Sequence, residues 1–158
     1  MARALEVPGF DCEEPFARAA AKVVEVRVAE VIEYSAGVLD VADIERLHDM
    51  RVATRRLRAA LEVFEPCFPR KRHRKALKRV KALADALGER RDRDVAIEFL
   101  EGFVGEAPEG DRAAVATLIE RLRTEQREAN DRLTPYVAPK RLKKLRRRLY
   151  KLVKVAGA

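Results

Sequence analysis

Residues 48–64 read HDMRVATRRLRAALEVF, a stretch in which four arginines and a histidine are interleaved with apolar side chains. With about 100° of rotation per helical residue and Leu47 set at zero, the basic side chains fall on one strip between about 20° and 100°. The members of this strip are Arg58, Arg51, Arg55 and His48. Apolar residues border the strip on both flanks, which favours a position in a crevice between packed neighbours. Arg56, near 180°, lies apart from the strip.

The next basic stretch, RKRHRKALKRVKALADALG at residues 70–88, repeats the pattern. With Leu77 set at zero, a second strip between about 40° and 100° contains Lys81, Arg74, Asp85 and Lys78. If the two helices pack in antiparallel fashion, the strips face one another across a groove. Rows of cations at these spacings repel one another, so something must compensate them. His73 is predicted to belong to a solvated, basic helix start.

Two kinds of group could compensate the strips. Guanidinium groups form bidentate hydrogen bonds with phosphate oxygens, so a repeating phosphate is a suitable external ligand. Acidic residues of the chain itself are the alternative, and the candidates are Glu62, Asp85, Asp92 and Asp94. Spacing alone leaves both explanations open.

Apolar residues recur at spacings of three and four in six stretches, and signals for strands are nearly absent. The predicted helices cover residues 15–35, 43–65, 70–87, 92–104, 111–134 and 139–155. The connections are short, so the sequence predicts an all-α antiparallel bundle of about six helices, forming a single domain over residues 1–158.

The predicted helix ends rest on residues with known terminal preferences. Asp43 is placed to cap the second helix, and prolines at positions 66 and 69 end it. Gly88 is predicted to end the third helix and Asp92 to begin the fourth. Prolines at 135 and 139 bracket the entry to the last helix.

The last predicted helix carries most of the net charge. The chain has a formal net charge of +8, which favours anionic partners. Beyond Asp131 there is no acidic residue, and nine lysines and arginines follow between residues 140 and 154. An apolar stripe runs through the same segment, formed by Leu142, Leu145, Leu149 and Leu152 or Val153. This helix is expected to dock by its stripe, while its basic face is solvated, extends an anion-binding surface, contacts nucleic acid or adsorbs to an anionic membrane.

Composition excludes several functional classes. The chain has 158 residues, of which 47% are hydrophobic, and it has no run of about 18 apolar residues and no secretory leader, so a cytoplasmic protein without a membrane span is expected. Cys12 and Cys67 lack metal-ligand spacing and are expected to be reduced. Glycine-rich phosphate loops are absent, and Ser35, the sole serine, has no evident base. We therefore expect no metal, no cofactor and no catalytic activity.

Three blocks of the sequence resemble the CHAD family, the conserved histidine α-helical domain. The blocks are HDMRVATRRLR at 48–58, the residues from Leu77-Lys78 to Leu87-Gly88, and RDRDV at 91–95. The resemblance implies an all-helical fold that binds inorganic polyphosphate along a basic channel and has no catalytic role of its own. It also implies association with polyphosphate granules and with polyphosphate- or triphosphate-metabolising enzymes.

The resemblance assigns phosphate contact to a set of basic residues, with second choices added by helical position. The first set is His48, Arg51, Arg55, Arg58 and Lys78, and the second choices are Lys81, Arg74 and Arg91. Arg56 is expected to orient or pair. Asp92 and Asp94 are expected to cap the following helix and to hold arginines in place.

One departure from the family pattern concerns length. Family domains contain two pseudo-symmetric halves, and only one clear copy of the basic blocks occurs here. A homodimer of half-length chains would rebuild the two-fold channel, whereas a fragment would lack its other half. Two other functions also remain open: a nucleic-acid-binding protein that acts through the last helix, and a protein-interaction module whose basic strip is neutralised internally.

Overall fold

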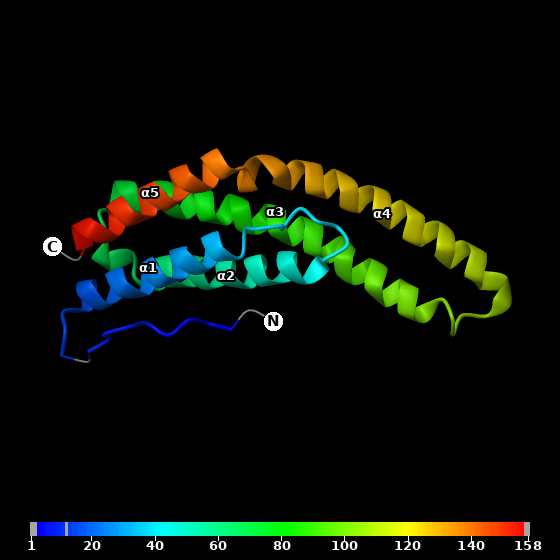
Figure 1. Ribbon diagram of the computed structural model, residues 1–158, viewed down its shortest axis with the longest axis horizontal. Helices are drawn as coiled ribbons and strands as arrows, with labels where there is room; N and C mark the ends of the chain where they lie inside the picture. Colours follow the sequence, from blue (N-terminus) through cyan, green and yellow to red (C-terminus); the bar gives the residue numbers. More distant parts are fainter. Residues whose placement is uncertain (1–2, 12, 157–158) are drawn as a thin grey trace.

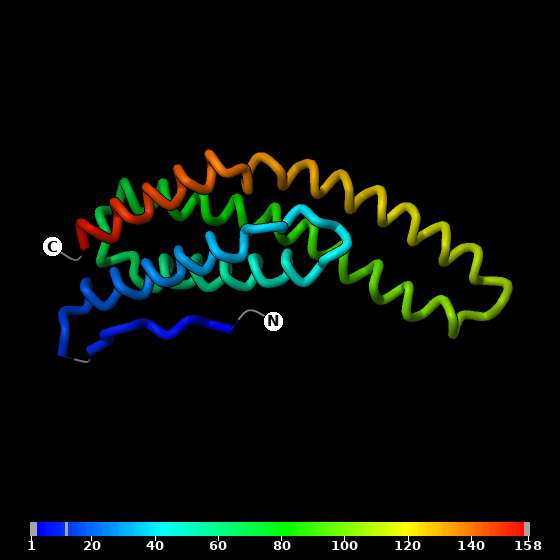
Figure 2. Tube along the Cα trace, in the orientation of Figure 1, coloured from blue at the N-terminus to red at the C-terminus, as the bar shows by residue number. Residues whose placement is uncertain are grey.

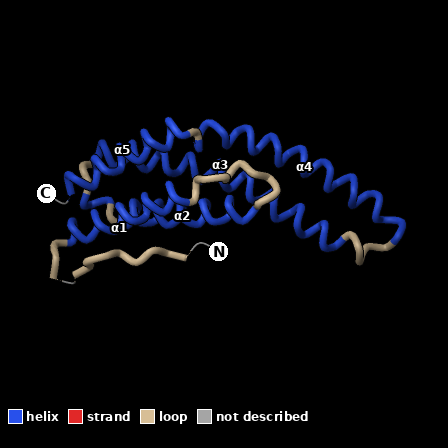
Figure 3. The backbone as a smooth tube through the Cα atoms, in the orientation of Figure 1, coloured by secondary structure: helices blue, strands red, loops and turns tan. Residues whose placement is uncertain are grey.

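The computed structural model describes residues 3–11 and 13–156, and within them it contains five α-helices and one short 3-10 helix. The elements are α1 (Phe16–Glu33), α2 (Ile44–Val63), η1 (Glu65–Cys67), α3 (Arg70–Phe103), α4 (Glu109–Val137) and α5 (Pro139–Ala156). No strand occurs in this part of the chain (Figure 3). The predicted all-α fold is confirmed.

The helices form an elongated bundle in which α1, α2, α3 and α4 alternate in direction, whereas α5 continues in the direction of α4 (Figure 1). Helix α1 packs against α2 and α5, and α3 packs against α2, α4 and α5. Helices α4 and α5 follow one another with only Ala138 between them, and together they run back along α3 (Figure 2). The last part of α3 and the first part of α4 extend beyond the other helices as a hairpin.

The number of helices differs from the prediction because the segments 70–87 and 92–104 are one helix, α3. Gly88 therefore does not end a helix, and Asp92 does not cap one. A glycine inside a helix costs about 1 kcal/mol relative to alanine, which is less than the packing energy that neighbouring helices supply. Since α3 contains no proline, nothing in its interior blocks the helical path.

The ends of the other helices lie within a few residues of the predicted positions. Asp43 occupies the N-cap position of α2 but makes no capping hydrogen bond with its side chain, because its carboxylate accepts one from Arg46 Nε at 2.8 Å. Helix α4 runs three residues past its predicted end, and Pro135 lies inside its last turn. Pro139 begins α5, a position where a missing N–H costs nothing.

The core is contributed by α1, α2, the first half of α3, the end of α4 and α5. The apolar stripe predicted for the last helix is buried in it, through Leu142, Leu145, Leu149, Leu152 and Val153. Helix α5 is thus one wall of the bundle, and its removal would expose the core side of α1.

The prediction for His73 is wrong, because this side chain is only 1% exposed. Its ring stacks on Phe68, and Nε2 donates a hydrogen bond to the carbonyl oxygen of Leu61 at 2.7 Å. Helix α2 ends at Val63, so its last carbonyls lack helical partners, and the ring satisfies one of them. With Leu77 set at zero, His73 lies at about −40°, away from the basic strip and among the apolar positions of its helix.

Candidate anion-binding groove

The arginine strip of α2 borders two adjoining hollows on the surface, which we call the α2–α3 groove. The first hollow has a volume of about 440 Å³ and is lined by Arg51, Arg55, Arg58, Ala84, Asp85, Gly88, Glu89 and Asp92. The second has a volume of about 490 Å³ and is lined by Val52, Arg55, Arg56, Arg58, Ala59 and Glu62. Two arginines, Arg55 and Arg58, line both hollows and so connect them.

The two walls of the first hollow carry opposite charges. Helix α2 contributes arginines, whereas α3 contributes Asp85, Glu89 and Asp92 instead of the expected lysines and arginines. One of these acids is already engaged, because Glu89 pairs with Arg132 of α4 at 3.3 Å. An anion in this hollow would therefore lie along the α2 wall.

One end of the strip is neutralised internally by Glu62. Its carboxylate lies 3.1 Å from Arg58 Nε and 2.9 Å from Lys81 Nζ. The hydrogen bond from Lys81, followed by that from Arg58, lowers the pKa of Glu62 below its ordinary value. Glu62 thus stays ionised and reduces the local positive charge.

The centre of the strip is different, because Arg51 and Arg55 make no ion pair with any described residue. Arg51 is half-buried and Arg55 is exposed. The side chain of His48, half-buried at the start of the strip, makes no hydrogen bond within the described part of the chain, and His48 lines neither hollow. Their donors are available to a ligand, and a partly buried charge is screened less by salt than an exposed one.

The other predicted contact residues do not line the groove. Arg74 and Lys78 are exposed on α3, and Lys81 is engaged by Glu62. Arg91 reaches back to α2, where its Nη1 donates to the carbonyl oxygen of Ile44 at 3.5 Å. The strips of α2 and α3 therefore do not meet as two cationic walls.

Comparison with known proteins agrees with this architecture. The family model of the CHAD domain matches residues 22–158, from within α1 to beyond the end of α5. The chain belongs to the CHAD-domain family. A search of curated proteins finds no match. The CHAD domain is a family associated with the binding of polyphosphate and triphosphate.

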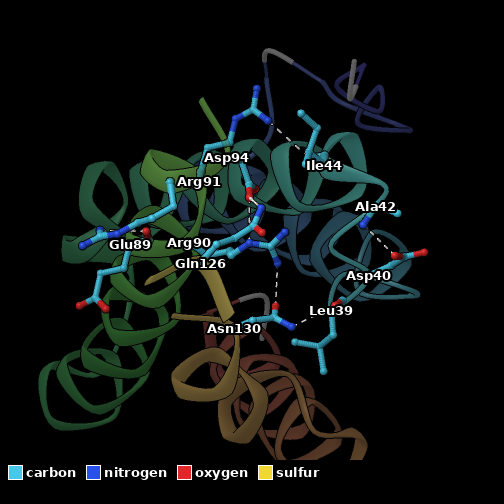
Figure 4. Close-up of polar contacts among 11 residues, drawn as sticks. Leu39, Asp40, Ala42, Ile44, Glu89, Arg90, Arg91, Asp94, Gln126 and Asn130 are labelled. Carbon is cyan, nitrogen blue, oxygen red and sulfur yellow. Dashed lines mark hydrogen bonds and ion pairs between the residues drawn. The ribbon is translucent and has the colours of Figure 1, made fainter. Parts of the chain in front are cut away.

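A buried polar network holds this CHAD domain together beside the groove, and the sequence did not reveal most of it. Figure 4 shows its members pointing toward one another from α3 and α4, namely Arg90, Asp94, Gln126 and Asn130. Asp94 accepts hydrogen bonds from Arg90 Nε at 2.8 Å and from Gln126 Nε2 at 2.6 Å. Asp94 thus caps no helix, but it holds an arginine in place, which was its other expected role, and that arginine lies four residues earlier.

Asn130 extends this network to a third segment of the CHAD domain. It accepts a hydrogen bond from Arg90 Nη1 at 2.7 Å and donates one to the carbonyl oxygen of Leu39 at 3.0 Å. Leu39 belongs to the connection that precedes α2. The spacing of four between Arg90 and Asp94 was the one available sequence signal, and it did not identify the partners on α4.

The remaining sequence expectations concern metals, thiols and membranes. Among the described residues, no three histidine, cysteine or acidic side chains gather as metal ligands would, and none of the helices has the length and hydropathy to cross a bilayer. Cys67 is a free, half-buried thiol whose pKa is raised by burial. Cys12 lies outside the described residues.

Proposed function

We propose that this CHAD domain is a binding module for inorganic polyphosphate and that the polyanion lies along the α2 wall of the α2–α3 groove. The observation that carries the proposal is the pair Arg51 and Arg55, two neighbouring guanidinium groups that have no carboxylate partner among the described residues and that line a groove. The association of the family with polyphosphate supplies the class of ligand.

The spacing along α2 suits a linear polymer of phosphates. His48, Arg51, Arg55 and Arg58 follow one another at intervals of three, four and three residues and cover about 15 Å of helix axis. Each guanidinium can form two parallel hydrogen bonds with one phosphate group. Consecutive arginines would therefore hold consecutive segments of the same chain, by charge and geometry without any covalent step.

Other basic residues would contribute less directly. Arg58 is shared between the groove and Glu62, so a phosphate has to compete with that carboxylate. Lys81 is held by the same acid, and Arg74 and Lys78 are exposed on α3. We propose that these α3 residues attract the polyanion at long range without contacting it directly.

Two partners belong to the same proposal. One is a second copy of the chain, so that a homodimer joins two grooves by symmetry, and the other is a polyphosphate- or triphosphate-metabolising enzyme.

The test is competition binding between long-chain polyphosphate and duplex DNA at about 0.15 M salt, where weak electrostatic binding is already screened. Arg51→Ala with Arg55→Ala should lower the affinity for polyphosphate about a hundredfold, since each lost charged hydrogen-bond contact contributes roughly 1.5 kcal/mol. The matched control is Arg121→Ala with Arg127→Ala, which removes the same charge from the exposed face of α4. Circular dichroism should show unchanged helicity in both variants.

An equal loss of affinity in the groove and control variants would mean that total charge, and not the groove, captures polyphosphate.

Binding of DNA as tight as that of polyphosphate would favour the second candidate, a nucleic-acid-binding surface on α5. That candidate rests on the exposed lysines of α5, among them Lys143, Lys151 and Lys154. Substitution of these lysines by alanine tests it without removing the buried stripe that α5 contributes to the core.

A further inference from the structure

A separate pocket lies where α4 turns into α5 beside α3. It has a volume of about 320 Å³ and is lined by Arg79, Ala82, Leu83, Pro135, Tyr136, Arg141 and Leu145. It shares no lining residue with the α2–α3 groove. On α3, Arg79 lies about 180° around the helix from Gly88, which lines the α2–α3 groove, so the two sites open on different sides of the bundle.

Three arginines bring uncompensated positive charge to this pocket. Arg79 and Arg141 line it, and Arg148 of α5 lies close enough to Arg79 to repel it electrostatically. None of the lining residues is acidic, and none of the three arginines makes an ion pair with a described residue. Burial, followed by repulsion from Arg148 and Arg141, lowers the pKa of Arg79. A guanidinium does not lose its proton at neutral pH, so only an anion relieves this repulsion.

The rest of the lining is apolar and includes one accessible aromatic ring. Tyr136 is 43% exposed, and Pro135, Leu83 and Leu145 line the same pocket. Pockets that bind small molecules combine an apolar lining with a few convergent polar groups. A bare inorganic anion would gain nothing from this apolar surface, whereas a planar organic group would stack on the ring and cover it.

We propose that the pocket between α3, α4 and α5 binds an organic phosphate monoester, with its phosphate at Arg79 and Arg141 and a planar group against Tyr136. Arg148, about two turns further along α5 than Arg141, adds attraction for the phosphate. The proposal does not depend on polyphosphate binding in the α2–α3 groove, because the two sites are built from different residues.

The test is calorimetric titration of the whole chain with adenosine monophosphate at about 0.15 M salt, with adenosine and inorganic phosphate as comparison ligands. Adenosine monophosphate should bind at least about tenfold more tightly than either comparison ligand, because only it satisfies both parts of the pocket. Arg79→Ala and Arg141→Ala should each weaken its binding about tenfold or more. Arg141 is exposed, so its substitution leaves the core intact.

Arg147→Ala is the matched control, since this exposed arginine lies about 100° around α5 from Arg148 and outside the pocket. It should bind adenosine monophosphate as the unsubstituted chain does, and so should the Arg51/Arg55 double variant. Unchanged binding in both pocket variants would overturn the proposal, as would loss of binding in the Arg51/Arg55 variant. Inorganic phosphate binding as tightly as adenosine monophosphate would overturn the assignment to an organic ligand.

Discussion

Arg55 and Arg58 lie less than one helical turn apart on the same wall, but their surroundings differ. Arg58 is held by Glu62, whereas Arg55 has no ion-pair partner in the described part of the chain. The angular positions of the two arginines around the helix follow from sequence spacing alone, and they predict that both side chains face the same crevice. The α3 residues that lie opposite them cannot be predicted in this way, because they depend on the register in which the two helices pack.

Glu62→Gln should increase the affinity for polyphosphate about fivefold, because it frees Arg58 and Lys81 at one end of the groove. A change of this size corresponds to about 1 kcal/mol, the upper range for one exposed ion pair. The measurement is titration with polyphosphate at fixed salt. Glu120→Gln, which removes one of the two carboxylates that pair with Arg123 on α4, is the matched control and should leave the affinity unchanged.

The contribution of Glu62 to the stability of the fold should depend on pH in a defined direction. The pKa of Glu62 is lowered in the folded chain, chiefly by Lys81 and then by Arg58. Its contribution to stability is therefore fully present above its unfolded-state pKa and is lost as the pH falls through the lower, folded-state pKa.

The affinity of the Glu62→Gln variant for polyphosphate has a contradicting outcome. A lower affinity in this variant than in the unsubstituted chain would show that Glu62 orients the arginines more than it competes for them.

Helix α3 shows where sequence patterns identify an element but misplace its ends. Apolar spacing located every α-helix, and the docking stripe of α5 was predicted residue by residue. The preference of glycine for the position after a helix predicts a helix end at Gly88, whereas α3 continues through it. This local preference is overcome by the packing of α3 against α2, α4 and α5.

Gly88→Ala should raise the free energy of unfolding by about 0.5 to 1 kcal/mol, because the residue is helical and an added methyl group meets nothing within 4 Å. Urea denaturation measures the difference. Gly102→Ala is the matched control in the last turn of α3, where helical propensity counts for less and a smaller gain is expected. A loss of stability in Gly88→Ala would mean that α3 bends or breaks at this position.

At the scale of the whole molecule, the polar network of Arg90, Asp94, Gln126 and Asn130 joins segments that lie far apart in the sequence. Arg90 is fully buried, and its partners come from α3 and α4. Charged residues are normally expected at the surface, so hydrophobic patterning gives no sign of such a network. The sequence therefore predicts the helical bundle, but it does not predict this network, which fixes α4 and the connection before α2 relative to α3.

Asp94→Ala should lower the free energy of unfolding by about 3 to 5 kcal/mol, because it leaves the buried guanidinium of Arg90 without its ion pair. Arg90→Met combined with Asp94→Leu should lose less than Asp94→Ala alone, since no unpaired charge remains. Chemical denaturation followed by circular dichroism gives both values. Equal losses in the two variants would indicate that packing at this position matters more than charge compensation.

Helix α1 packs against α5, so the first helix of the bundle has the last one as its neighbour. During synthesis, α1 and α2 can pair early, but the core side of α1 stays uncovered until α5 has left the ribosome. At about 5 to 20 residues per second, the residues that separate these helices take several seconds to add. The newly made chain therefore passes through a stage in which apolar surface is accessible to chaperones, and closure of the bundle is a late step of its biosynthesis.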